Sequence, residues 1–322
     1  MRPKPLLRLL RSVQEQSLYP DEILVVDGST NSETRIVLVE NTFKNLTYFL
    51  VPKEYRGLTR QRNYGVDKAS ETSDMIAFVD DDTELTPNYF EELVRTFVAD
   101  KTIFGVGGVA LNENSWVLAE PNKQYNKYHF FQFDKFVYKE GKRNVVRNYL
   151  RLQSNLEPGK MPDYSHGRTC GFPLDGKIYK VDLLIGMSFA FRKIVFDSIQ
   201  FSSYFEGYGL YEDADFSIRA LQFGSNVINT KVQLNHYHDA SGRPNQYQYG
   251  KMVVRNGWYV WRTKNPTPTF THQFKWHSIT ILLTLIRFSN TFTTHKRKQA
   301  LTEALGRTVG WWSLIFNEPK EN

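Results

Sequence analysis

Short apolar runs alternate with helical patterns over about the first 110 residues of the chain. Residues 22–27 and 75–79 have the character of buried strands, because each is a short apolar run bounded by turn residues. Further strands are expected at residues 46–51 and 103–111, and helices at residues 5–17, at residues 33–41, after Arg56 and from Thr86–Pro87 onward. This alternation predicts an α/β fold in which helices flank a mostly parallel sheet.

Carboxylates stand at the ends of two of these strands. Asp27 closes the first apolar run, and Asp80, Asp81 and Asp82 directly follow the run at residues 75–79. Ligands of open α/β sheets bind just beyond the carboxyl ends of the strands. Adjacent carboxylates repel one another unless a cation or a network of donors compensates them, and oxygen ligands suit Mg²⁺ or Mn²⁺. A divalent-metal site and a solvated acidic turn are the two interpretations of this stretch.

The regular alternation ends at about residue 112. From there to about residue 176 the composition shifts toward Tyr, Phe, Lys and Asn, and several prolines indicate a loop-rich region. Arg143, Arg147 and Arg151 recur at every fourth position and would share one helical face, which we expect to be solvated. The pattern therefore predicts an aromatic-rich insert.

Strand and helix patterns resume after the insert. Residues 179–191 have strand character, and a helix with an acidic first turn is expected at residues 212–223. Acids in a first turn usually serve the helix dipole alone. The strand pattern of residues 226–238 ends in His236 and His238. A lone histidine is more often structural, but two imidazoles near a presumed metal site are candidate ligands.

The remainder of the chain, from about residue 245, is predicted to be helical and basic. Aromatic and basic residues on amphipathic helices can lie in a membrane interface or pack back onto the domain, and we favour packing. The longest apolar run near the C-terminus, Ile279–Ile286, is far shorter than the ~20 residues that span a bilayer. No transmembrane helix is predicted.

Composition narrows the class of protein without choosing a function. With 322 residues, 41% of them hydrophobic, the chain can bury the core of one large domain or two modest ones. Its 41 Lys and Arg against 34 Asp and Glu are a mild excess that suits phosphorylated ligands or an anionic membrane, and too diffuse to indicate nucleic-acid binding. Cys170 is the single cysteine and no apolar signal segment opens the chain, which points to the cytoplasm.

Five motifs occur in an order that is more specific than any one of them. They are Val25–Thr30, Gly57–Gly65, Phe78–Asp82, Gly186–Arg192 and Gly207–Asp213. Together they resemble family 2 glycosyltransferases over roughly residues 1–240, which implies the Rossmann-like GT-A fold. In addition, Arg255–Tyr259 is similar to the helix after the catalytic region in bacterial members that build cell-surface polysaccharides.

The resemblance implies roles for the matching positions of this sequence. Asp80 and Asp82 would bind the donor diphosphate through Mn²⁺ or Mg²⁺, with Asp82 as the principal metal ligand. Asp213 would be the general base of an inverting transfer. The other candidates are Asp27, Arg60, Arg62, Asn63 and Asp81 for the nucleotide and donor, Glu212 as a second catalytic residue, Gly186, Met187 and Ser188 for the acceptor, and His236 and His238 for the metal.

The chemistry of sugar transfer suits these residue types independently of the resemblance. Cleavage of the bond between the anomeric carbon and a diphosphate builds negative charge on the leaving group, which a metal ion and cationic side chains stabilise. On the opposite side of the sugar an acceptor hydroxyl must lose its proton, which is work for a carboxylate such as Asp213. Direct displacement of this kind inverts the anomeric centre.

We therefore expect an enzyme that moves a sugar from a nucleotide-diphosphate donor to a hydroxyl of a glycan or lipid-linked acceptor. Residues 1–111 would form the nucleotide-sugar-binding half, residues 112–244 the acceptor side with the insert, and residues 245–322 a helical basic extension. No nucleic acid is expected as a partner. The expected location is the cytoplasm or the inner face of the cytoplasmic membrane, with peripheral contact through the C-terminal helices.

Two other functions stay open. A sugar nucleotidyltransferase also joins an α/β sheet to metal-binding acids, but it normally carries a Gly-rich phosphate loop with Lys or Arg near its start, and the sequence has no such motif. Members of the resembled family begin with a strand that we expect to be missing here, because the sequence opens at what would be the first helix. A catalytically silent carbohydrate- or lipid-binding scaffold is the second alternative.

Overall fold

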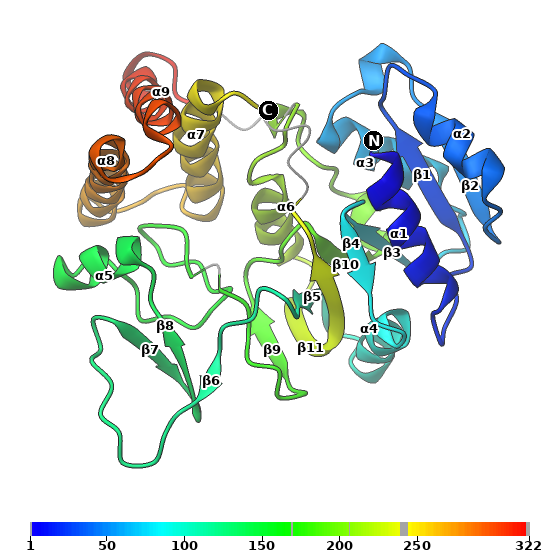
Figure 1. The fold of residues 1–322 in the computed structure, drawn as a ribbon, viewed down its shortest axis with the longest axis horizontal. Coiled ribbons are helices and arrows are strands. Elements are labelled where there is room, and N and C mark those ends of the chain that lie inside the picture. Colours follow the sequence, from blue (N-terminus) through cyan, green and yellow to red (C-terminus); the bar gives the residue numbers. More distant parts are fainter. Residues whose placement is uncertain (1, 169, 206, 239–243, 320–322) are drawn as a thin grey trace. The chain divides into compact units, whose positions relative to one another are not determined.

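The computed structural model describes residues 2–168, 170–205, 207–238 and 244–319 (Figure 1). These residues belong to two compact units, unit 1 from residues 1–114 and 174–242, and unit 2 from residues 115–173 and 243–322. The chain passes from one unit to the other three times. The aromatic-rich insert thus groups with the C-terminal helices and not with the strands that flank it in the sequence.

Unit 1 contains two sheets among its described residues. Strands β1 (Ile23–Asp27) and β2 (Leu46–Leu50) pair in parallel. The larger sheet has the order β3 (Met75–Val79), β10 (Ser188–Arg192), β5 (Ile103–Ala110), β11 (Ser225–His236) and β4 (Thr83–Leu85), and β9 (Ile178–Val181) also pairs with β11.

The larger sheet is mixed, in contrast to the mostly parallel sheet predicted. Strands β3, β5 and β11 run in one direction, whereas β10, β4 and β9 are antiparallel to their neighbours. The prediction is therefore wrong for half of these strands. Strand β10 is buried along almost its whole length, and an antiparallel strand covered on both faces has the same apolar pattern as a parallel one.

Helices pack on both sides of the larger sheet. Unit 1 includes α1 (Pro3–Gln14), α2 (Glu33–Glu40), α3 (Leu58–Lys68), α4 (Tyr89–Ala99) and α6 (Glu212–Ala220), with short 3₁₀ turns at Lys53–Tyr55, Lys193–Asp197 and Ser203–Phe205. On α1, Leu9 and Val13 join the core of the larger sheet, while Leu6 and Leu10 pack on Val25 of β1. Helix α1 is therefore the element that links the two sheets.

One predicted helix start is wrong. The helix expected from Thr86–Pro87 begins at Tyr89, because Thr83–Leu85 form β4, an extra strand paired with β11. The Thr86 hydroxyl donates to the carbonyl of Gln233 at 2.9 Å instead of capping a helix. The three acids at 80–82 consequently lie in a tight turn between two strands.

An aromatic cluster covers the other face of the larger sheet and fixes α6. Successive residues of a strand point to opposite faces, so Ala190 of β10 lies in the core beneath α4 while Phe191 points away from it. The Phe191 ring lies 4.8 Å from that of Phe216 on α6, and Phe201 stacks on Phe216 at 4.3 Å between centroids. This packing holds the first turn of α6 at the edge of the sheet.

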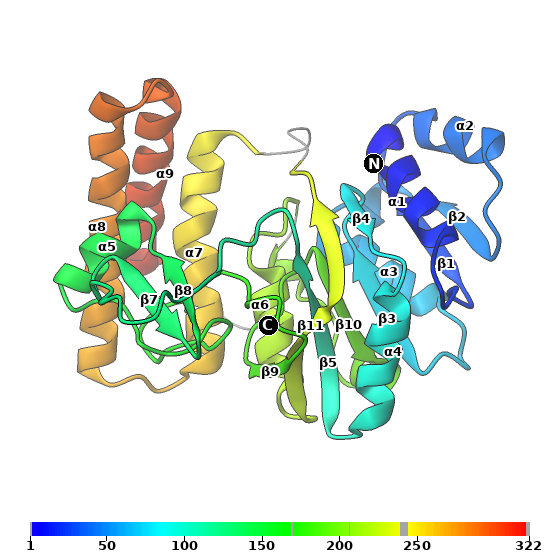
Figure 2. The same ribbon diagram turned by 60° about the horizontal axis from the view of Figure 1, so that its bottom comes forward.

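Unit 2 combines a small antiparallel sheet with four helices within its described residues. The sheet has the order β6 (Val117–Leu118), β8 (Phe136–Lys139) and β7 (Phe130–Phe133), and the helices are α5 (Lys142–Tyr149), α7 (Gln246–Lys264), α8 (Phe270–Thr293) and α9 (Arg297–Phe316). Figure 2 shows α7, α8 and α9 packed next to one another. The side chains of Trp258, Trp261 and Trp276 form the core between α7 and α8.

The prediction of a solvated arginine face on the insert helix is wrong at Arg147. This side chain is 8% exposed and donates to the hydroxyl of Ser165 at 3.3 Å. Beside it, Arg168 and Glu140 form a buried ion pair at 2.9 Å. Arg151 lies beyond the end of α5 with a positive φ of 57°. The buried arginines of the insert thus hold its loops together through a hydrogen bond and an ion pair, which the spacing of arginines in the sequence does not reveal.

Candidate functional site

The turn between β3 and β4 presents the three adjacent acids. The backbone N–H of Asp80 donates to the carbonyl of Met187 at 3.1 Å, which continues the pairing of β3 with β10. The Thr83 hydroxyl donates to the Asp80 carbonyl at 2.8 Å and tightens the turn. Two flanking strands therefore hold the carboxylates at one edge of the sheet.

His236, the last residue of β11, meets this turn because β11 pairs with β4. In that ladder His236 lies opposite Thr83, and its Nε2 is 3.4 Å from Oδ1 of Asp82. One donor atom each from Asp80, Asp82 and His236 lies within 4.8 Å of the other two. The structure thus brings three of the four predicted metal ligands together.

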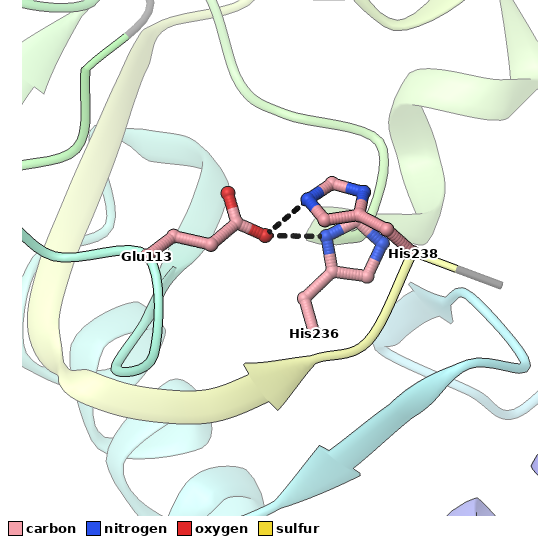
Figure 3. Close-up of side chains that lie close together, drawn as sticks. All are labelled: Glu113, His236 and His238. Atoms are coloured by element: carbon pink, nitrogen blue, oxygen red, sulfur yellow. Dashed lines mark hydrogen bonds and ion pairs between the residues drawn. The ribbon is translucent and has the colours of Figure 1, made fainter.

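The fourth predicted ligand, His238, belongs to an adjoining cluster with Glu113 (Figure 3). One carboxylate oxygen of Glu113 lies 2.8 Å from Nδ1 of His236 and 2.8 Å from Nε2 of His238. Figure 3 shows the carboxylate of Glu113 directed at both imidazole rings. His236 therefore faces a different carboxylate with each of its ring nitrogens.

Glu113 was missed by the sequence reasoning. It lies three residues after the end of β5, so the rule that singled out Asp27 and Asp80 at strand ends also applies to it. The change in composition at residue 112 makes Glu113 look like the first part of the insert instead of a strand-end acid. The antiparallel return of β4 on β11, which brings the histidines to this edge, has no signal in the sequence.

A positively charged group already lies against the acids. The guanidinium of Arg2 forms an ion pair with Asp81, and its Nη1 lies 3.0 Å from Oδ2 of Asp82. Asp82 is 4% exposed, and its backbone carbonyl accepts a hydrogen bond from the N–H of Tyr237 at 3.0 Å. Carboxylates packed this closely bind positive charge, as a metal site requires.

Protonation equilibria at this edge reflect the crowding of charge. Loss of solvation raises the pKa of Asp80 to about 6, with the Asp82 carboxylate acting in the same direction and Arg62 opposing it. For His236, burial disfavours the charged ring, yet the carboxylates of Asp82 and Glu113 outweigh that effect and raise its pKa. The crowding of charge at this edge therefore shifts the pKa of both Asp80 and His236 upward.

Arg62 connects the acidic turn to the first turn of α6. Its Nη1 lies 2.5 Å from Oε1 of Glu212 and its Nη2 lies 3.8 Å from Oδ1 of Asp80, with both Arg62 and Glu212 buried. The guanidinium also lies 4.8 Å above the ring of Phe189. Burial raises the pKa of Glu212 to about 8, with the neighbouring Asp213 acting in the same direction and Arg62 opposing.

Asp213 is held by backbone donors. Its Oδ2 accepts from the N–H of Gly186 at 2.8 Å, and its Oδ1 from the N–H of Ala214 at 2.8 Å. A side chain at Gly186 would press on Glu212, Arg62 and Asp213 at 3.2 to 3.3 Å. Tyr211, directly before α6, has a φ of 71°, an uncommon conformation for a bulky residue. The positions of the Glu212 and Asp213 side chains therefore depend on the close packing of the backbone at Gly186 and Tyr211.

Asp27 lies at the carboxyl end of β1, in the smaller sheet. It is fully buried, accepting from the Ser29 N–H at 2.8 Å and from the Tyr48 hydroxyl at 2.9 Å. Burial alone would favour the neutral acid, but these hydrogen bonds lower the pKa of Asp27. It is thus a carboxylate fixed in place by its own sheet.

Four other predicted site residues are engaged elsewhere. The Asn63 side chain exchanges two hydrogen bonds of 2.9 Å with the backbone of Phe201. Arg60 donates to the Glu54 carbonyl at 2.8 Å. The side chains of Met187 and Ser188 are buried, and the Ser188 hydroxyl lies 2.6 Å from that of Tyr89. The 186–188 segment contacts the acidic residues through its backbone, at the N–H of Gly186 and the carbonyl of Met187.

Comparisons with known proteins match parts of the chain to glycosyltransferases. Residues 1–157 match the model of glycosyl transferase family 2. Over 115 residues the chain is 30% identical to the glucosyl-dolichyl phosphate glucuronosyltransferase of Haloferax volcanii, covering 35% of this chain and 34% of that protein. Over 239 residues it is 25% identical to the putative glycosyltransferase EpsH of Bacillus subtilis, covering 71% of this chain and 55% of that protein. The matched stretches thus span about a third and about half the length of these relatives.

Among solved structures, the chain is similar to that of GalNAc-T7 with UDP, GalNAc and Mn²⁺. The TM-score is 0.50 at 17% identity, covering 80% of this chain and 46% of that chain. The fold is the GT-A glycosyltransferase fold. The fold predicted from the ordered motifs is thereby confirmed, although a fold by itself does not fix an activity. None of the helices in the described part of the chain combines the length and the apolar character needed to cross a membrane.

Proposed function

We propose that this protein is an inverting, metal-dependent family 2 glycosyltransferase that moves a sugar from a nucleotide-diphosphate donor to a hydroxyl acceptor. One observation carries the proposal. Donor atoms of Asp80, Asp82 and His236 lie within 4.8 Å of one another, and Arg62 joins this group to the acidic first turn of α6. Glycosyl transfer needs a site for a diphosphate and a base beside it, and these two clusters supply both.

Asp80, Asp82 and His236 would hold the divalent cation. Two carboxylates and one imidazole suit Mn²⁺ better than an all-oxygen set would, and the ion pair between Arg2 and Asp82 supports the affinity of this turn for positive charge. When bound, the cation would neutralise negative charge that develops on the leaving diphosphate. Mn²⁺ in the related GalNAc-T7 structure supports the same choice.

Asp213 would take the proton from the attacking acceptor hydroxyl. Its two backbone hydrogen bonds keep the carboxylate oriented in the first turn of α6. Glu212 would act through Arg62, because it is buried and paired with that guanidinium. Arg62 in turn would fix Asp80 relative to α6. Asp27 would contact the nucleotide base at the end of β1 and Asp81 the donor.

Glu113 would orient His236. A carboxylate that accepts from one imidazole nitrogen fixes the ring and leaves the other nitrogen free for a metal. Here Nδ1 of His236 faces Glu113 while Nε2 faces Asp82, which is the geometry that such a role requires. His238 contacts the same oxygen of Glu113 and would fix that carboxylate.

The acceptor class that we propose is a glycan or a lipid-linked sugar. The Haloferax volcanii relative is named for a glucosyl-dolichyl phosphate, which is a lipid-linked sugar, and its similarity to this chain supports the second choice. The backbone of Gly186, whose N–H donates to Asp213, would then lie next to the bound acceptor.

A donor screen tests the proposal. Purified protein is incubated with a panel of nucleotide sugars, with Mn²⁺ or with EDTA, and release of nucleoside diphosphate is measured. We expect hydrolysis or transfer with at least one donor, only when the metal is present. Pyrophosphate release from a nucleoside triphosphate and a sugar phosphate would instead indicate a nucleotidyltransferase. Absence of any metal-dependent nucleotide binding would indicate a silent scaffold.

A further inference from the structure

Helix α8 of unit 2 carries a continuous apolar stripe that faces solvent. Its exposed members occur at intervals of four and seven residues, which places them along one side of a helix. They are Phe270, Phe274, Ile281, Leu285 and Phe292, which are 81%, 63%, 41%, 59% and 83% exposed. At 1.5 Å per residue the stripe runs for roughly 33 Å, the length of the helix. An exposed apolar surface of this length on a globular domain indicates a binding surface.

Helix α9 carries a second stripe of the same kind. Its exposed members are Leu301, Leu305, Val309, Trp312 and Phe316, and their spacing again fits one side of a helix. The opposite side of α9 packs closely on α7, where Gly306 and Gly310 contact the backbone of Tyr247 and Lys251. Helix α8 likewise buries Trp276 against α7. Both stripes therefore lie on sides of α8 and α9 other than the sides that pack on α7.

The exposed charged side chains on these two helices are all positive. Residues 270–316 contain six basic residues and one acidic residue, Glu303. Glu303 is 5% exposed and is paired with Arg287 and Arg307 at 2.8 Å each, so it contributes no negative charge to the surface. The short connection between α8 and α9 and the start of α9 expose Lys296, Arg297 and Lys298. In this part of the chain, the described surface is thus apolar and cationic and carries no carboxylate.

We propose that the outer sides of α8 and α9 dock on an anionic lipid surface. The aromatic and aliphatic side chains of the two stripes enter the interface between headgroups and acyl chains, and the Lys296–Lys298 turn contacts lipid phosphates. The complete lack of exposed carboxylates on these helices selects an anionic surface over a mixed-charge protein surface. Neither helix spans the bilayer, in keeping with their amphipathic pattern. This inference does not depend on the proposed glycosyl transfer.

Co-sedimentation of the full chain with vesicles tests the proposal. Vesicles of phosphatidylcholine alone are compared with vesicles that contain about 30 mol% phosphatidylglycerol, at low and high salt. We expect binding to the anionic vesicles that weakens as salt rises, because salt screens the cationic turn. Phe274→Ser with Leu285→Ser, and separately Lys296→Glu with Lys298→Glu, should each lower vesicle binding at least about tenfold.

The matched control replaces exposed apolar residues of unit 1, Ile36→Ser with Val39→Ser on α2, which are 52% and 77% exposed in the unaltered chain. This control should bind vesicles like the unaltered protein, and circular dichroism checks that all variants fold. Equal loss of binding in the control would overturn the proposal. So would a lipid-free dimer that the α8 variant converts to monomer, because the stripe would then be an interface between copies of this chain.

Discussion

At the scale of single residues, the acids near the sheet edge differ in what surrounds them. Asp82 contacts a histidine and a guanidinium, whereas Asp213 contacts only backbone donors among the hydrogen bonds described above. The first environment suits a ligand of a cation, and the second suits a base that must stay accessible to a hydroxyl. Separate substitutions should therefore separate metal binding from chemistry.

Asp82→Ala should abolish both metal binding and turnover. Without this carboxylate, His236 and Asp80 alone offer too few ligands for a divalent cation held by protein side chains. Titration of Mn²⁺, followed by calorimetry or electron paramagnetic resonance, should show loss of the site. Undiminished metal-dependent turnover in this variant would refute the assignment of Asp82.

Asp213→Asn should leave donor and Mn²⁺ affinity intact while lowering the rate of transfer by roughly 10² to 10⁴, the usual contribution of a general base. The amide keeps an oxygen that can accept from Gly186 but loses the bond from the N–H of Ala214, so circular dichroism checks that the variant folds. The measurement is kcat alongside the dissociation constant of the nucleotide. A variant with normal kcat would exclude Asp213 as the base.

Glu113→Ala should weaken Mn²⁺ binding by roughly 10- to 100-fold, the usual effect of removing a partner of a metal-bound histidine. Glu84→Ala is the matched control, because Glu84 is a neighbouring acid that is bonded to Tyr237 and not to either histidine. We expect the control to retain the affinity of the unaltered protein. Equal affinities in the two variants would count against a role for Glu113.

The position of these acids could be predicted in part from the sequence, since Asp27 ends and Asp80–Asp82 follow apolar runs that do form strands. The partnership of Arg62 with Glu212 could not, because it joins residues 150 positions apart through the packing of α3 and α6. The sequence also could not predict that the Ser188 side chain is buried or that the Asn63 side chain bonds to the backbone of Phe201. These depend on strand register and loop geometry, on which local sequence carries no information.

At the scale of elements, glycines determine how closely helices of unit 2 approach. Gly306 of α9 contacts the carbonyl of Tyr247 on α7, and Gly250 of α7 contacts the carbonyl of Glu303 on α9. A Cβ at either position would overlap backbone atoms, which cannot move away as a side chain can. The crossing of α7 and α9 therefore depends on both glycines.

Gly306→Ala should destabilise the protein by about 1–3 kcal/mol, the usual cost of overpacking, even though alanine favours a helix. Gly141→Ala is the matched control, because an added Cβ there meets no atom within 4 Å and the backbone φ is −67°. Chemical denaturation followed by fluorescence compares the two. A Gly306 variant as stable as the control would show that the two helices can separate at no cost.

Most long elements of unit 1 agree with the hydrophobic pattern, since amphipathic helices such as α1 and α4 bury the side that the spacing indicates. The pattern fails at β4, which has three residues and follows charged ones. It also fails for strand direction in β10 and for buried Arg147. In each case long-range pairing overrides a local preference.

At the scale of the whole molecule, stability should depend on pH through His166 in unit 2. Burial lowers the pKa of His166 from 6.5 to about 4, with a backbone hydrogen bond to Gly257 opposing the shift. Between these values the unfolded chain binds a proton that the folded chain does not, so the free energy of unfolding falls as pH drops from 6.5 toward 4.

His166→Gln should remove this part of the pH dependence, because glutamine does not titrate. Denaturant midpoints of both proteins are measured at several pH values, and the difference between them is followed. We expect the unaltered protein to lose stability relative to the variant below pH 6.5. A difference that stays constant with pH would contradict the buried neutral imidazole.

The division into two units is the feature that sequence reasoning captured least. We expected residues 112–244 to form one acceptor side with the insert, whereas residues 115–173 group with the C-terminal helices and residues 174–242 with unit 1. Contacts between segments so far apart leave no periodic signal. The ordered motifs nevertheless identified the GT-A fold, because each marks a strand end or helix start of unit 1.

Because the chain passes between the units three times, segments that pack together are synthesised at different times. Trp261 on α7 donates to the carbonyl of Asp163 at 2.9 Å, and Lys264 donates to that of Met161, so the insert is bonded to a helix made later. About 90 residues separate Pro173 from Trp261. At 5–20 residues per second, the ribosome needs roughly 5–20 s to supply them. During that time the insert is made but its partner helix is not, so chaperones that shield nascent chains have access to its unpaired surface.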